Sequence, residues 1–317
     1  MITDWPRGAL IGGLLALLLG ACGSDGTRQE SSLERKLPPA LKTLQAKGDA
    51  DSLAAAAILT EWPKDDAAKQ LALLTRAATL APSRADLAWL QLESCGRVDS
   101  CDPAPLATRL HALDEENGAA WGLLLTRAAK AGDEGAVSKY LSAIASTKRF
   151  DIYWNPSIAR LSDAVSDGHA MGMPTALAAV IGTEAALAIP AYQHLSNACK
   201  PPALQEPGRP ETCRRISEVL RNGDTYITEM IGVAIAKRVW PDDSEEYAGA
   251  VAARRLAQYR MKTMASILPD SFRTDAEAKQ YVTLLATHRT EQEVATAVIT
   301  AAGKSLDPPP NWKETWH

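Results

Sequence analysis

AAWGLLLTRAAKAGDEGAVSKYLSAIAS, residues 119–146, is the stretch from which the fold of this chain is predicted most directly. Two apolar runs of helical length flank Ala131-Gly132-Asp133-Glu134, which combines a helix stop, a turn and a new start. We therefore predict two short helices, 119–131 and 134–146, that pack against each other as a helical hairpin.

The same punctuation recurs along the chain and predicts a series of short helices. We expect Pro38-Pro39 to start the first of them rather than interrupt it, and Asp51 or Ser52 to cap the second. Short helices with short connections are typical of helical hairpins rather than of a four-helix bundle. The other expected helices are 33–46, 51–62, 66–80, 84–94 and 104–113 in the first half, and 174–188, 191–198, 212–221, 224–240, 245–264, 275–287 and 291–302 in the second.

The composition favours the same all-α class. Of the 317 residues 46% are hydrophobic, but only two are phenylalanine, and alanine and leucine dominate. Runs of β-branched and aromatic residues, which favour strands, are scarce in the sequence. The net charge is −4, and nothing in the sequence suggests the basic patch that a nucleic-acid partner would require.

Tryptophans mark a repeat in the middle of the chain. Trp89, Trp121 and Trp154 fall 32 and 33 residues apart, and turn-like segments precede the first two. This pattern resembles the tetratricopeptide repeat, most closely over residues 81–145, although the Gly-x-x-Tyr element of that family is missing after each tryptophan. The alternative is an irregular helical domain with tryptophans at chance spacing.

The resemblance implies tetratricopeptide-like helical hairpins that form a short α-solenoid over residues 32–165. Such a stack would bury Trp89 and Trp121 in its core, and its concave groove would bind a peptide or a partner helix. Residues 166–303 depart from the pattern and are predicted to form an irregular α-helical second lobe, followed by a proline-rich tail at 304–317.

The first residues of the chain predict where the protein is located. Arg7 lies in a short n-region that also contains Asp4, and an apolar run of eleven residues follows from Ala9 to Leu19. Spanning a bilayer takes about 20 residues, so this run has the length of a signal-peptide h-region instead. The run ends in Leu19-Gly20-Ala21-Cys22, which resembles the lipobox of bacterial lipoproteins.

The lipobox resemblance implies that residues 1–21 are removed and that Cys22 carries a diacylglycerol and, on its new amine, a further acyl chain such as palmitate. Gly23 follows the cysteine in place of an aspartate, which implies the outer membrane, on its inner leaflet and facing the periplasm. Residues 22–31 are small and polar and are expected to form a flexible tether. The alternative is a plain secretory signal with a chance cysteine.

The spacing of the cysteines agrees with export. Besides Cys22 there are two close pairs, Cys95 with Cys101 and Cys199 with Cys213. The intervening residues are loop-like, and prolines are expected to keep the longer stretch out of a helix, so two disulfide bonds are predicted for an oxidising compartment. Zinc binding and free thiols are the alternatives, but neither pair has zinc-ligand spacing.

Motifs for catalysis, phosphate binding, dinucleotide binding or a zinc protease are not found in the sequence. We therefore predict no enzyme activity, cofactor, metal or small-molecule substrate. His194 is the most suggestive histidine because Tyr192 and Cys199 are close in sequence, although a surface or core histidine is the simpler interpretation. We attribute the pairs of adjacent acidic residues to helix starts, where they favour the positive end of the helix dipole. We attribute the pairs of adjacent arginines to solvated helix faces, with an anionic partner as the alternative. These pairs are Glu115-Glu116, Asp242-Asp243, Glu245-Glu246, Arg214-Arg215 and Arg254-Arg255.

Three classes of function remain, in order of preference. The first is a periplasm-facing interaction or scaffold protein that binds an envelope protein or peptide and is held to the membrane by its N-terminal lipid. The second is an immunity-type lipoprotein that inhibits a periplasm-acting toxin through the loop between Cys199 and Cys213. The third is an enzyme without a recognisable motif, for which a convergent set of buried polar residues around His194 would be needed.

Overall fold

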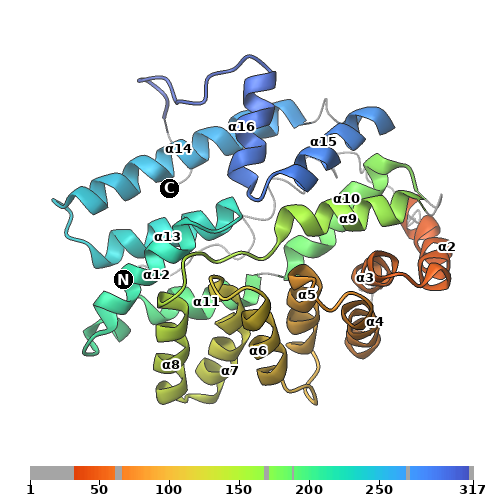
Figure 1. Cartoon of the computed structure of the whole chain (residues 1–317). Coiled ribbons are helices and arrows are strands. Elements are labelled where there is room, and N and C mark those ends of the chain that lie inside the picture. The colour runs from red at the N-terminus through yellow and green to blue at the C-terminus, as the bar shows by residue number, and fades with distance from the viewer. Residues whose placement is uncertain (1–31, 61–65, 168–170, 188, 269–271, 314–317) are drawn as a thin grey trace, which may run out of the picture.

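The computed structural model describes residues 32–60, 66–167, 171–187, 189–268 and 272–313. Within these residues every regular element is helical, which confirms the all-α prediction (Figure 1). Cys22 and the predicted tether lie outside the described residues. The elements in chain order are α2 (Ser32–Lys47), α3 (Ala50–Leu59), α4 (Ala67–Leu80), α5 (Ala85–Cys95), α6 (Ala104–Leu113), η1 (Gly118–Trp121), α7 (Gly122–Ala131), α8 (Glu134–Ala145), α9 (Trp154–Asp167), α10 (Met173–Leu187), α11 (Ile189–Ala198), η2 (Ala203–Gln205), α12 (Arg209–Arg221), α13 (Tyr226–Val239), α14 (Glu245–Ile267), α15 (Asp275–Thr287) and α16 (Glu291–Ala301).

Side chains at the helix starts explain several of these boundaries. At α4 the Asp66 carboxylate accepts a hydrogen bond from a backbone N–H in the first turn (3.3 Å), and Asp133 does the same at α8 (2.9 Å). Capping boxes begin α15 at Thr274 and α16 at Thr290. Such caps satisfy N–H groups that have no acceptor within the helix. The starts predicted for these four helices therefore agree with the structure to within a residue.

Other details of the sequence prediction are wrong. Pro38 and Pro39 lie inside α2 instead of starting it, because a proline removes a donor but keeps a helical φ. The cap of α3 is Asp49, whose carboxylate accepts from the backbone N–H of Ser52 (2.9 Å), so this helix begins earlier than expected. Helix α9 has no counterpart in the prediction, and residues 118–121 form the turn η1 ahead of α7 rather than the first turn of one α-helix.

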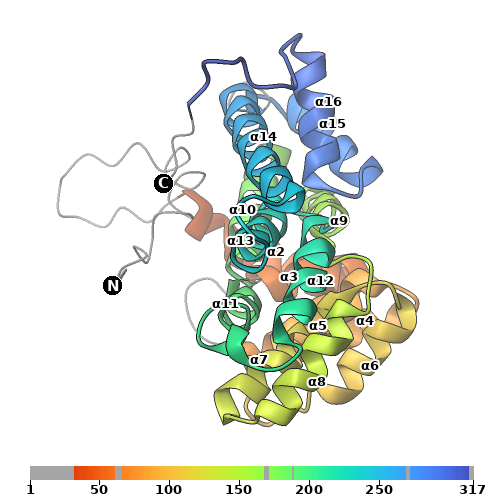
Figure 2. The same ribbon diagram turned by 90° about the vertical axis from the view of Figure 1, so that its left-hand side faces the viewer.

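The helices form three layers, which both views show (Figures 1 and 2). The first layer is a helical row in which α3, α4, α5, α6, η1, α7 and α8 follow one another, each in contact with the next. The middle layer contains α9 to α13, and α14, α15 and α16 form the third. Helices α9 and α10 pack on α3, α11 packs on α7, and α12 packs on α8. The middle layer of the same chain therefore covers one face of the helical row.

One hydrophobic cluster extends through all three layers, from Leu37 in α2 to Ile299 in α16. It contains Trp89, which is 4% exposed, as predicted for a core residue. The same prediction is wrong for Trp121, which is only partly buried and packs at the edge of the cluster against His111 and Tyr140, with ring centroids 5.1 and 6.4 Å away. Trp121 ends the turn η1, and its partly buried ring lies between His111 of α6 and Tyr140 of α8.

Both predicted cysteine pairs are at disulfide distance. The Sγ atoms of Cys95 and Cys101 lie 2.06 Å apart, and those of Cys199 and Cys213 lie 2.03 Å apart. The longer stretch is not entirely loop, because α12 starts within it and carries Pro210 in its first turn, where a missing N–H costs no hydrogen bond. Among the described residues, none of the helices combines the length and the hydrophobicity needed to cross a membrane.

Candidate functional site

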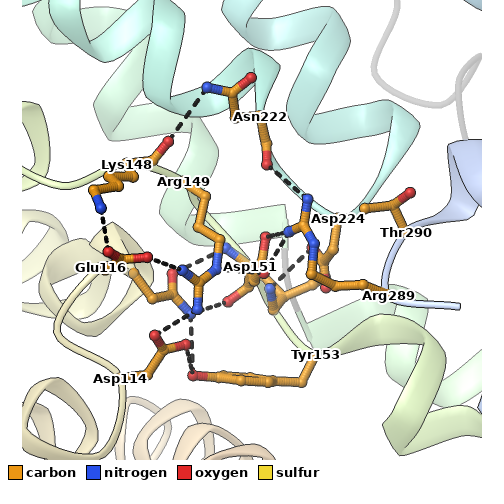
Figure 3. Close-up of polar contacts among 12 residues, drawn as sticks. Asp114, Glu116, Lys148, Arg149, Asp151, Tyr153, Asn222, Asp224, Arg289 and Thr290 are labelled. Carbon is orange, nitrogen blue, oxygen red and sulfur yellow. Dashed lines mark hydrogen bonds and ion pairs between the residues drawn. The ribbon is translucent and has the colours of Figure 1, made fainter.

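The largest polar network shown in the structure lies where four helix–helix connections meet (Figure 3). These connections join α6 to η1, α8 to α9, α12 to α13, and α15 to α16, so the network links all three layers. We call it the polar junction. Its members are Asp114, Glu116, Asn117, Lys148, Arg149, Asp151, Tyr153, Asn222, Asp224 and Arg289.

Asp151 lies at the centre of the polar junction, and its side chain is 5% exposed. Arg149 donates to it from Nε (2.9 Å), and Arg289 donates from Nη1 to both carboxylate oxygens (2.7 and 2.6 Å). Burial raises the pKa of Asp151, and both guanidinium groups act in the opposite direction. Because a buried carboxylate needs such partners, Asp151 ties the α8–α9 connection to the α15–α16 connection.

Arg149 also reaches the connection ahead of η1. Its Nη2 donates to Asp114 (2.5 Å) and its Nη1 to Glu116 (3.2 Å), and Lys148 forms a second ion pair with Glu116. Glu116 does lie at a helix start, directly before the N-cap Asn117 of η1, but its carboxylate also binds two cations from the connection after α8. A sequence pattern of adjacent acids could not show this, because the cations lie more than thirty residues further along the chain.

Tyr153 adopts a left-handed backbone conformation, with φ of 58°. Its hydroxyl donates to the Asp114 carboxylate (2.8 Å) and accepts from the Asn117 amide (3.1 Å). A positive φ is uncommon for a bulky residue and is kept only where the surroundings hold it in place. These side-chain bonds supply part of that restraint.

Asp224 also restrains the backbone around Tyr153. Its buried carboxylate accepts from the backbone N–H groups of Ile152 (3.0 Å) and Trp154 (2.9 Å), which flank Tyr153 on either side. Burial raises the pKa of Asp224 to about 8 in spite of these two bonds. The polar junction thus fixes the turn that enters α9, and it does so with groups from the first and middle layers.

The contacts of the polar junction are those of a structural network that holds the four connections together. Each of its four carboxylates accepts hydrogen bonds from arginine, lysine, a tyrosine hydroxyl or backbone N–H groups, and these donors stabilise the carboxylates where they lie. Catalysis by a nucleophile would need a hydroxyl or thiol held against a base. The Tyr153 hydroxyl does donate to the Asp114 carboxylate, but burial raises the pKa of that hydroxyl, which disfavours the phenolate that a tyrosine nucleophile would require. Among the described residues, no cluster of histidine, cysteine and carboxylate side chains is arranged to hold a metal ion.

Two open depressions lie on the surface of the described part. One, of about 650 Å³, is lined by residues from the ends of α2 and α9, from 171–172 and from α15. The other, of about 480 Å³, adjoins the polar junction and shares Lys148 and Asn222 with it. We call this second depression the α8–α12 depression. Its lining residues are Ala145, Ser146, Thr147, Lys148, Arg215, Glu218, Val219 and Asn222.

Apart from the two cysteine pairs, the candidate residues singled out in the sequence do not meet in one site among the described residues. His194 is half buried on α11, and burial together with Lys130 lowers its pKa. Arg214 stacks over Trp240, with its guanidinium carbon 4.4 Å from the ring centroid, and Arg255 binds the C-terminal segment. Arg214 and Arg255 are therefore not simple solvated charges, whereas Arg215 is 64% exposed, as expected for a solvated helix face. Cys22 lies outside the described residues.

Sequence reasoning missed the buried acids of the interior. Glu93 on α5 and Glu184 on α10 are buried, and each has a carboxylate oxygen without a hydrogen-bond partner among the described atoms. Burial raises the pKa of Glu93 to about 8 and also raises that of Glu184. The sequence around Glu93 gives little sign of its burial. Helix α5 is buried from Asp86 to Cys95 because neighbouring helices cover it, and the local sequence does not show those neighbours.

No protein-family model matches this chain, and neither a curated protein nor a solved structure shows significant similarity to it.

Proposed function

We propose that this chain is a lipid-anchored protein of the bacterial envelope that faces the periplasm and serves as a protein-interaction or scaffold module. The proposal rests on the cysteines. The N-terminal region contains the lipobox-like Leu19-Gly20-Ala21-Cys22, and the four other cysteines lie in two pairs at disulfide distance. Disulfide bonds persist in oxidising compartments such as the periplasm, so the pairs support the export that the N-terminus predicts.

The lipid would account for attachment without a membrane-spanning helix. Each buried methylene contributes about 0.8 kcal/mol, and two or more acyl chains give a stable anchor. Residues 23–30 are small and polar and would let the helical body move relative to the membrane surface.

An interaction role fits the surface better than catalysis does. The charged groups of the polar junction are bound to one another, and one face of the helical row is covered by α9–α12, so a partner would bind to an outer face instead. The α8–α12 depression offers such a face, since Lys148 and Arg215 are 75% and 64% exposed beside Glu218. Mixed charge around a shallow depression is typical of the polar rim of a protein–protein interface.

Fractionation of Cys22→Ser tests the anchor. The variant should accumulate as unprocessed precursor and leave the outer-membrane fraction, because a serine cannot form the thioether. Gly23→Asp is the matched control: it keeps the cysteine, so it should still be processed and should move to the inner membrane. Recovery of Cys22→Ser with the outer membrane, at the mature size, would refute the lipid anchor.

Affinity capture from the native envelope tests the interaction surface. Arg215→Glu should abolish recovery of the partner, because it reverses a charge at the α8–α12 depression. Lys262→Glu, an equal charge change on the exposed side of α14, should leave recovery unchanged. Equal recovery with both variants would place the partner elsewhere.

The loop 200–208 supports a second candidate, an immunity-type inhibitor of a periplasm-acting toxin. Most of its residues are exposed, Cys199 and Cys213 close its base, and Arg209 holds it to α8 by a hydrogen bond to Ser138 Oγ (3.1 Å). An exposed loop closed by a disulfide could enter the active site of an enzyme. Replacing residues 203–207 with glycine and serine should then abolish inhibition of a captured envelope enzyme, and Arg215→Glu should not.

A further inference from the structure

The C-terminal segment of the described chain lies against α14. It leaves α16 and runs back over the third layer, as both views show (Figures 1 and 2). Its sequence is Leu306-Asp-Pro-Pro-Pro-Asn-Trp312, and we call it the tail segment. Three consecutive prolines fix φ near about −65°. The segment ends in a turn, in which the backbone N–H of Trp312 donates to the carbonyl oxygen of Pro309 (2.9 Å).

One arginine of α14 donates hydrogen bonds to three backbone carbonyls of the tail segment. The Nη2 group of Arg255 donates to the carbonyl oxygens of Pro309 (2.9 Å), Pro310 (3.4 Å) and Trp312 (3.4 Å). Arg260 donates from Nε to the carbonyl of Leu306 (3.2 Å) at the other end of the segment. A proline-rich segment offers carbonyls but few N–H groups, so a guanidinium, which only donates, is well matched to it.

Aromatic contacts fix the end of the same segment. The rings of Trp312 and Tyr259 pack edge to face, with centroids 5.7 Å apart and an interplanar angle of 87°. The Arg255 guanidinium carbon lies 5.9 Å from the centroid of the Trp312 ring. Edge-to-face rings and cation–π contacts add specificity to the carbonyl contacts.

The tail segment lies on the surface, and of its residues Leu306 packs against the edge of the large hydrophobic cluster. Asp307, Pro309 and Pro310 are exposed, and Leu306 and Trp312 are only partly buried. Detaching it would therefore leave the packing of the helices in place. A surface that binds a polyproline-type segment through an aromatic ring and side-chain donors is a known mode of peptide recognition.

We propose that Arg255, Tyr259 and Arg260 form a recognition surface on α14 for a proline-rich segment of a partner protein, and that the tail segment occupies this surface in cis. The partner segment has the chemistry of the tail itself: consecutive prolines that end in a turn, with an aromatic ring two residues after the last proline. The cis segment competes with it at an effective concentration on the order of millimolar. This inference deepens the proposed interaction role by naming the class of partner, and it does not depend on the lipid anchor.

Fluorescence anisotropy of the purified full-length mature protein tests the surface directly. The probe is a labelled peptide with the sequence of residues 305–313, SLDPPPNWK. Wild type should bind it weakly, because the tail segment occupies the surface. Trp312→Ala should free the surface and bind the peptide at least about tenfold more tightly. The double variant with Arg255→Ala should lose this gain, and Arg160→Ala, an exposed arginine of α9, is the matched control that should keep it.

Trypsin digestion reports the release of the tail segment independently. Lys304 precedes the segment and donates to Ser266 Oγ (3.2 Å), so cleavage after it should be several-fold faster in Trp312→Ala, with an unchanged melting temperature. Three results would overturn the proposal: no peptide binding to Trp312→Ala, undiminished binding after Arg255→Ala, or equal binding of a peptide whose prolines are replaced by alanine. A tail that stays protected in Trp312→Ala would also overturn it. Because the protein is purified, failure here leaves the fractionation test of the anchor untouched.

Discussion

Glu93 and Asp224 are buried carboxyl groups with different surroundings. Asp224 accepts two backbone N–H bonds, whereas one oxygen of Glu93 has no hydrogen-bond partner among the described atoms. Burial raises the pKa of each to about 8. Since the folded chain binds these protons more tightly than the unfolded chain, each group stabilises the fold fully at acid pH. That contribution is lost as the pH rises from the unfolded pKa to the folded one.

Glu93→Gln should therefore flatten the dependence of stability on pH. The pKa of Glu93 is raised from 4.5 to about 8, so between these values wild type should lose roughly 1.4 kcal/mol of unfolding free energy for each pH unit from this group. The variant should lack that loss. Its unfolding free energy should therefore decrease less between pH 5 and pH 9 than that of wild type. Urea unfolding at both pH values measures the effect.

Exposed Glu115→Gln is the control, because it removes the same charge from the surface. The other buried acids, such as Asp224, remain in both proteins and contribute a decline of the same sign. If Glu93→Gln and wild type lose stability in parallel between the two pH values, Glu93 is not held in the protonated form that burial implies.

Helix boundaries show what local sequence can predict. Asp66, Asp133 and Thr274 cap the helices that follow them, and these starts were predicted because the capping bonds are local. The cysteine pairs could also be predicted, because the two cysteines of each pair are close in sequence. The polar junction was not predicted, because Asp151 contacts Arg289 across 138 positions of the chain and the periodicity of the sequence does not indicate such a contact. The docking of the tail segment on Arg255 is equally remote in sequence.

Gly232 shows how one element depends on another. It lies in α13, and a Cβ built there would be 2.8 Å from the backbone nitrogen of Arg221 and 2.8 Å from the backbone oxygen of Ser217, both in α12. A Cβ on Gly249 of α14 would meet nothing within 4 Å. The two glycines therefore share the same helix propensity and differ in their neighbours.

Alanine at these two positions should have opposite effects on stability. Gly232→Ala should destabilise the fold by about 1–3 kcal/mol, because α12 and α13 would have to move apart. Gly249→Ala should stabilise it by about 0.5–1 kcal/mol through helix propensity alone. Chemical denaturation of both variants at one pH makes the comparison. A stabilising Gly232→Ala would mean that the two helices are not in the close contact described here.

At the scale of the whole molecule, one large hydrophobic cluster links the three layers, and a second, small one lies between α13 and α14. The large cluster joins α2, the helical row, the middle layer and α16, so the predicted boundary at residue 166 lies inside a continuous core. The polar junction adds contacts among the same layers. Cooperative unfolding of single-domain proteins depends on such shared packing.

Calorimetry should therefore record one unfolding transition, with equal calorimetric and van't Hoff enthalpies. Reduction of the cysteine pairs should lower its midpoint without splitting it, because Cys95–Cys101 and Cys199–Cys213 each close a short local loop. Two separate transitions, or a stable protease fragment that ends near residue 166, would show instead that residues 32–165 and 166–303 fold as independent lobes.

Location of the molecule rests on one residue, Cys22, and a single mass measurement tests it. Protein purified from the envelope of its native host is digested with trypsin, and the N-terminal peptide is analysed by mass spectrometry. The lipoprotein assignment predicts that the chain begins at Cys22 and that the peptide 22–28 carries a diacylglycerol and an amine-linked acyl chain. An unmodified Cys22, or a chain that begins at any other residue, would contradict it.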